Sequence, residues 1–182
     1  MQTDDLGALS SWPAEMLITE ERREHSLCML LFLESTSASA AVWSGADRSS
    51  WLAAWSASIA ALVTRPDDWE EDFEFVRQAS AWAEHLAEHL GDAVLDDALA
   101  DAYGTWLEAA APSDAEVTYD DRVLDDLVAA WRVGLRTLVV LPTSGTMAVR
   151  LSASTLLLSM PVRSDVEHFR SALRMFATDR SG

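Results

Sequence analysis

The sequence predicts an α+β protein with a mainly helical middle and a C-terminal sheet. Three observations predict it: apolar residues recur at helical spacing through 49–135, short apolar runs separated by turn residues occupy 137–160, and an amphipathic segment follows. The 182 residues, 49% of them hydrophobic, can bury a core without disulfides or structural metal. We therefore expect a single domain over residues 1–182, with an acidic helical part at 49–135 and a sheet with a closing helix at 137–177.

About four helices account for the middle of the chain. The first has the strongest pattern, because Ser49 or Ser50 can cap it, apolar residues follow every three or four positions, and Pro66 ends it. The other three are expected at residues 67–90, 92–110 and 120–135, each opened by an aspartate.

The N-terminal region leaves two alternatives open. Pro13 favours a first helix through Glu24, since the first turn of a helix tolerates proline. The apolar run at 27–33 is readable as a buried strand or as the end of a longer helix, and periodicity does not separate the two. In the strand alternative, residues 40–43 form a partner strand, and an N-terminal hairpin joins the sheet.

The C-terminal part is predicted to be a three-stranded antiparallel meander closed by a helix. Its strands are expected at 137–141, 147–151 and 155–160, and the second alternates apolar and polar residues as a half-buried strand does. Pro161 is expected to end the third strand, and Asp165 to cap the closing helix.

The composition excludes several kinds of chemistry. The thirteen basic residues are all arginine, so a lysine Schiff base, a pyridoxal-phosphate enzyme and a P-loop ATPase are excluded. Asparagine is also missing, which indicates the codon bias of GC-rich bacterial genes. Cys28 is the single cysteine, it lies in an apolar run, and we interpret it as an inert core thiol. With an acidic N-terminus and no apolar run near 20 residues, a cytoplasmic protein without a membrane span is expected.

The formal charge of −17 is concentrated in the middle of the chain. Residues 66–126 hold nineteen acidic residues and two arginines, whereas eleven acidic residues and eleven arginines balance elsewhere. Such a field repels nucleic acid and anionic membranes and attracts cationic partners. The alternative interpretation is that the acidic residues only solvate exposed helices, with the basic C-terminal part neutralising some of them.

Two histidines offer the best metal candidate. His85 and His89 are four residues apart, a spacing that lets two imidazoles share one ion, and Asp92 lies on the same face one turn further on. The position after His85 is Leu86 rather than the glutamate of a metalloprotease helix. We favour solvated histidines, and expect no cofactor.

Arginines near the predicted meander offer an anion-binding candidate. Arg132 and Arg136 are four apart, so two guanidinium groups share a helix face, and Arg150 lies on a predicted strand. A second set of arginines extends this candidate: Arg163, Arg170 and Arg174. We favour the alternative that these arginines pair with the acidic helices of the same chain.

Arg163 and His168 form an Arg-x4-His pattern, which is similar to the short signature of toxin-type helical ribonucleases. That resemblance implies an RNA-cleaving site at these two residues. We favour the interpretation in which Asp165 caps the closing helix and His168 lies in its first turn.

Two functional hypotheses follow. The first is a non-catalytic module whose acidic helices bind a basic protein, as an immunity protein or antitoxin, a nucleic-acid mimic or a small secretion-type chaperone does. Its partner-binding residues are expected on the third helix: Asp96, Asp97, Asp101 and Glu108. The second is a small-molecule-binding protein or enzyme with an Arg/Trp-lined pocket or a His-metal site. We favour the first, since no catalytic motif is present; direct nucleic-acid or membrane binding is not expected, and a homodimer stays open.

Overall fold

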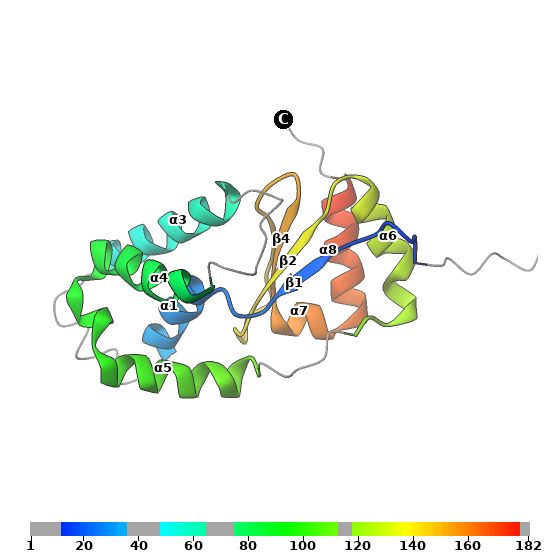
Figure 1. Cartoon of the computed structure of the whole chain (residues 1–182). Helices are drawn as coiled ribbons and strands as arrows, with labels where there is room; N and C mark the ends of the chain where they lie inside the picture. The colour runs from blue at the N-terminus through cyan, green and yellow to red at the C-terminus, as the bar shows by residue number, and fades with distance from the viewer. Residues whose placement is uncertain (1–11, 36–47, 65–74, 113–117, 179–182) are drawn as a thin grey trace, which may run out of the picture.

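A four-stranded mixed sheet lies between two groups of helices (Figure 1). The computed structural model describes residues 12–35, 48–64, 75–112 and 118–178, and in these ranges seven α-helices accompany the sheet. The predicted α+β composition is confirmed. The predicted antiparallel meander is wrong, because most of the strand pairs are parallel.

The elements follow one another in a simple order along the chain. The first strand leads into the N-terminal helical layer: β1 (Thr19–Glu21), α1 (His25–Ser35), α3 (Arg48–Thr64), α4 (Phe75–Leu90), η1 (Asp92–Leu95) and α5 (Asp97–Ala110). The chain then builds the sheet and the C-terminal helical layer: η2 (Asp121–Val123), α6 (Leu124–Arg132), β2 (Thr137–Leu141), β3 (Ala148–Arg150), β4 (Thr155–Ser159), α7 (Met160–Ser164) and α8 (Val166–Thr178).

The strand order is β1-β2-β4-β3, with β1, β2 and β4 parallel and β3 antiparallel to β4. A meander would place β3 in the middle, but β4 inserts between β2 and β3. The physical reason is visible in the strands: β2 and β4 are apolar without alternation, as parallel strands covered on both faces are. The short β3 lies at the edge, where Val149 is 43% exposed.

Side chains from the two faces of the sheet enter two separate cores. Leu138, Leu156 and Leu158 pack with the residues of α6 and α8, including Phe169. Val139, Leu141 and Leu157 face the opposite way and pack with the N-terminal helical layer. This alternation follows from the two-residue period of a strand. The sheet is thus the middle layer of three.

The apolar run at 27–33 is helical and belongs to α1. Four consecutive residues, Leu27 to Leu30, are completely buried, because this helix lies inside its layer and is covered around its circumference. An apolar helix of this kind shows no periodicity, which explains the ambiguity of the sequence. The predicted partner strand at 40–43 lies outside the described residues.

The predicted first helix through Glu24 is wrong, and a short strand takes its place. Residues 12–18 form turns and extended chain, and β1 pairs with β2 in parallel. The backbone N–H of Thr19 donates to the carbonyl of Arg136 at 2.8 Å. Pairing with a strand more than 100 residues away along the sequence outweighs the local preference for a helix.

The helices of the middle are confirmed with changed boundaries. α3 covers the predicted apolar spacing, but it already includes Arg48, so the predicted cap at Ser49 or Ser50 is wrong. α4 is helical from Phe75 on, and the predicted end of α3 at Pro66 and the predicted cap of α4 at residues 67–68 lie outside the described residues. The expected helix at 92–110 breaks at Asp96, whose carboxylate caps α5 by accepting from the N–H groups of Ala98 and Leu99. The fourth helix ends at Arg132, close to Gly134 with its φ of 121°.

The sequence gives no sign of α7, a single helical turn between β4 and α8. Pro161 ends the strand as expected, but it does so in the first turn of this helix, where its missing N–H costs nothing. The predicted cap of the closing helix is confirmed, since the carboxylate of Asp165 accepts from the N–H of His168 at 2.9 Å. In the described ranges no helix is long and apolar enough to cross a membrane.

Candidate functional site

The predicted partner-binding acids lie along α5, at the outside of the N-terminal helical layer (Figure 1). Asp97 and Asp101 are exposed and, four residues apart, lie on one face of the helix. The other two have structural contacts. Asp96 caps α5, and Glu108 accepts from Arg23 at 2.9 Å. Asp97 and Asp101 are therefore the pair whose charge can be changed with least effect on the fold.

The opposite face of α5 anchors it to α1 and α4. Tyr103 is buried among aromatic rings of Phe32, Trp82 and Trp106, and its hydroxyl donates to the carbonyl of His25 at 3.2 Å. The ring of His25 stacks on Trp82, and burial, followed by the charge of Arg23, lowers the pKa of His25. A rigid aromatic core thus fixes the acidic face of α5.

His85 and His89 are neighbours on α4, as the spacing predicts. Their ring centroids are 5.7 Å apart at an interplanar angle of 84°, and both residues are half-buried rather than exposed. Nε2 of His85 is buried without a hydrogen-bond partner, while Asp92 is exposed in η1. Across the described ranges, no three His, Cys, Asp or Glu residues group closely enough to hold a metal ion.

The three predicted anion-binding arginines have different surroundings. Arg136 donates to the carbonyls of Trp131 and Leu135 and lies 5.5 Å from the ring centroid of Trp131. Arg150 lies 4.3 Å from the ring centroid of Phe176 and donates to the carbonyls of Phe176 and Ser152. Arg132 is exposed in the last turn of α6. These contacts give Arg136 and Arg150 structural roles in holding loop and helix ends.

Arg170 and Arg174 pair within the chain, as our favoured interpretation expects. Both donate through Nε to the carboxylate of Asp126, each at 2.8 Å, so that α8 is tied to α6. Partial burial favours the neutral form of Asp126, but the hydrogen bonds from Arg174 and Arg170 outweigh it and lower the pKa of Asp126. Cys28, also as expected, is a buried core thiol, and burial raises its pKa.

A buried carboxylate that the sequence did not reveal organises the other arginine cluster. The side chain of Glu20, 1% exposed, accepts from Nε of Arg22 at 2.6 Å and from Nε of Arg163 at 2.8 Å. Tyr119 donates its hydroxyl to the same carboxylate at 3.3 Å. Burial and the charge of Glu20 raise the pKa of Tyr119 to about 12, so its hydroxyl keeps the proton that it donates. We name Glu20, Arg22, Tyr119 and Arg163 the Glu20 cluster.

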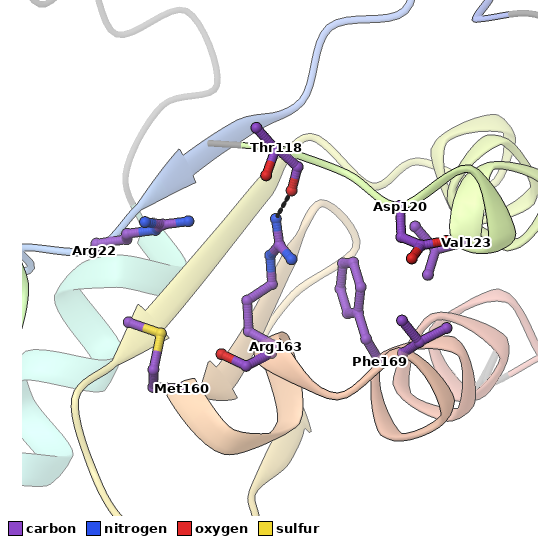
Figure 2. Close-up of a pocket in the computed structure, with 9 residues that line it drawn as sticks. Arg22, Thr118, Asp120, Val123, Met160, Arg163 and Phe169 are labelled. Atoms are coloured by element: carbon purple, nitrogen blue, oxygen red, sulfur yellow. Dashed lines mark hydrogen bonds between the residues drawn. The ribbon is translucent and has the colours of Figure 1, made fainter. Parts of the chain in front are cut away.

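Arg163 is held by aromatic rings and by a backbone carbonyl as well as by Glu20. Its guanidinium carbon lies 4.7 Å from the ring centroids of both Tyr119 and Phe169, and its Nη2 donates to the carbonyl of Thr118 at 2.8 Å (Figure 2). His168 has a different partner. Its Nδ1 lies 3.0 Å from the carboxylate of Asp165, in the first turn of α8. The Arg-x4-His pattern therefore divides between two sets of partners.

The Glu20 cluster borders a cavity of about 340 Å³. Its lining includes Arg22, Arg163, Asp120, Val123 and Phe169; in Figure 2 the ring of Phe169 lies beside Arg163, and Asp120 and Val123 lie on the far side from Arg22. Arg22 follows β1 and Arg163 follows β4, so the cavity lies at the carboxyl end of parallel strands, the usual place for ligands in open sheets that contain parallel strands. The sequence did not predict this site, because Glu20 and Arg22 fall in a segment for which it predicts a helix rather than a strand.

Comparisons of the chain with models of protein families, with curated proteins and with solved structures found no match.

Proposed function

We propose that this protein is a protein-binding module that uses the acidic outer face of α5 to bind a basic partner. The observation that carries this proposal is the contrast between exposed and paired acids. Asp97 and Asp101 project from a rigidly packed helix without a cation beside them in the described part of the chain. Exposed charge of one sign on a fixed surface steers a partner of the opposite sign and raises its association rate.

Further features of this surface fit a protein partner. Leu95, 46% exposed in η1, precedes the acids and offers an apolar contact, and interfaces combine such contacts with a polar rim. A second copy of this chain would bring the same negative charges to the surface. This face therefore favours a different, basic protein over a homodimer.

The sharpest test compares two matched pairs of aspartates. Asp97→Asn with Asp101→Asn removes two charges from α5, and Asp121→Asn with Asp125→Asn removes two from the start of η2 and α6. In each pair the two aspartates are exposed, lie four residues apart and are close to the start of a helix. The tagged wild-type protein and both variants are used to capture partners from host lysate at low salt, followed by a salt step and mass spectrometry.

We expect one basic protein to be released in stoichiometric amounts from the wild type and from the Asp121/Asp125 variant. The α5 variant is expected to bind this protein at least tenfold more weakly, since each lost charge pair at an interface costs about 1 kcal/mol or more. Equal capture by all three proteins, or an empty eluate from the folded wild type, would contradict the proposal.

A further inference from the structure

We propose that the cavity beside the Glu20 cluster binds a small monocarboxylate with a short apolar tail, and that Arg22 holds its carboxylate. This site is separate from the acidic face of α5 and involves none of its residues. The proposal rests on three properties of the cavity: its unused hydrogen-bond donors, its net charge and the apolar part of its lining.

The donors come from the two arginines. An arginine carries five N–H groups in a planar fork. Arg22 uses its Nε on Glu20, and Arg163 uses Nε on Glu20 and Nη2 on Thr118. Neither Nη of Arg22, nor Nη1 of Arg163, has a hydrogen-bond partner among the described residues. The buried Glu20 fixes both side chains, so these donors are held in place before a ligand arrives.

The charge balance selects the ligand class. One buried carboxylate faces two guanidinium groups, which leaves the Glu20 cluster with one net positive charge. Asp120 at the rim does not compensate it, because Arg122 binds that carboxylate through two nitrogens and lowers the pKa of Asp120 to about 2. A single negative charge balances the cavity, whereas a dianionic phosphate leaves an excess. Arginine also binds the planar carboxylate in a bidentate geometry.

The rest of the cavity lining combines polar groups with an apolar part. The apolar part is formed by Val123, Met160, Val166 and Phe169, and Met160 lies below Arg22 in Figure 2. A volume of about 340 Å³ is at the small end of ligand pockets, which begin at about 300 Å³. An acid with a carbon chain of a few atoms therefore fits both the charge and the volume.

The experiment titrates the whole protein with hexanoate, with the neutral isostere hexanamide and with inorganic phosphate. Binding is followed by calorimetry and by NMR of methyl-labelled methionine, with the Met160 signal assigned from Met160→Leu. We expect hexanoate to bind with one-to-one stoichiometry and to shift the Met160 methyl signal. The signals of Met16 and Met175, which do not border the cavity, are expected to remain unchanged.

Two arginine variants make the assignment specific. Arg22→Gln is expected to weaken hexanoate binding about tenfold or more, as the loss of a charge-assisted hydrogen bond does. Arg132→Gln removes the same charge from an exposed position in α6 and is expected to change nothing. Val166→Phe fills the cavity without altering its charge and is expected to abolish binding, which keeps the test valid if Arg22→Gln unfolds.

Several results would overturn the proposal. Hexanamide binding as tightly as hexanoate would show that charge is irrelevant, and tighter binding of phosphate through Arg22 would assign the site to a different anion. An unchanged Met160 signal at the solubility limit of hexanoate, or equal loss in Arg132→Gln, would remove the cavity as the site. The α5 variant Asp97→Asn with Asp101→Asn is expected to bind hexanoate normally, so failure of either proposal is distinguishable from failure of the other.

Discussion

The two helical layers place their charges in opposite ways. In the C-terminal layer, Asp126 is bound by two arginines of α8, and the Glu20 cluster ties β1 to α7 through a buried carboxylate. In the N-terminal layer, α5 carries its acids towards solvent and one described pair, Arg23 with Glu108, connects it to the segment before α1. Both layers have an apolar core, but the C-terminal layer adds buried and partly buried ion pairs to it, whereas the acidic side chains of α5 are exposed.

The largest expected effect on the free energy of unfolding comes from replacing the buried Glu20 of β1. Glu20→Gln leaves the guanidinium groups of Arg22 and Arg163 without their negative partner, and breaking a buried ion pair from one side costs about 3 kcal/mol or more. The free energy of unfolding is measured by urea denaturation. Glu15→Gln, an exposed glutamate in the same segment, is the matched control and is expected to change stability by less than about 0.5 kcal/mol. A similar small change for both variants would mean that this cluster does not stabilise the fold.

The next effect, on pH dependence, belongs to the N-terminal layer. Burial and Arg23 lower the pKa of His25 in the folded protein, so unfolding takes up a proton as the pH falls below the ordinary value of about 6.5. The stability contributed by neutral His25 is complete above that pH and is lost below it, with a slope of up to about 1.4 kcal/mol per pH unit. Urea denaturation at a series of pH values measures this slope.

His25→Gln is expected to remove the slope between about pH 6.5 and 5, whereas His168→Gln, at an exposed site, is expected to retain it. Asp126 affects a different pH range. The folded protein lowers its pKa, so the stability that the ionised Asp126 contributes is complete above the ordinary aspartate pKa of about 3.9 and is lost only as the pH falls below it. A slope that persists in His25→Gln would assign the titration to a different group.

The smallest effect is expected for the exposed pair that joins α5 to the segment before α1. Arg23→Gln and Glu108→Gln each break an ion pair whose side chains are 31% and 51% exposed, and such pairs contribute about 1 kcal/mol or less. A double-mutant cycle measures their coupling by urea denaturation, in low and in high salt. Coupling as large as the effect of Glu20→Gln would remove the contrast between the two layers.

Local sequence patterns were sufficient for the helices with a polar side or a clear cap. α3 forms where its apolar spacing predicts a helix, and Asp120 and Asp165 cap helices where the sequence places them. These elements depend on interactions between residues a few positions apart, and such local interactions can be recognised in the sequence. The partner-binding residues stay a prediction, although the structure separates the capping Asp96 from the exposed Asp97 and Asp101.

The sequence alone determined the α+β composition, the concentration of acidic charge at 66–126 and the core position of Cys28, since each follows from composition or from a local pattern. Tertiary structure decided that β1 replaces a predicted helix, that β4 inserts between β2 and β3, and that Glu20 meets Arg163 across 143 positions of sequence. The physical reason is the same for all three. Strand pairing and a buried ion pair depend on which distant segments come together, and no local spacing encodes that choice.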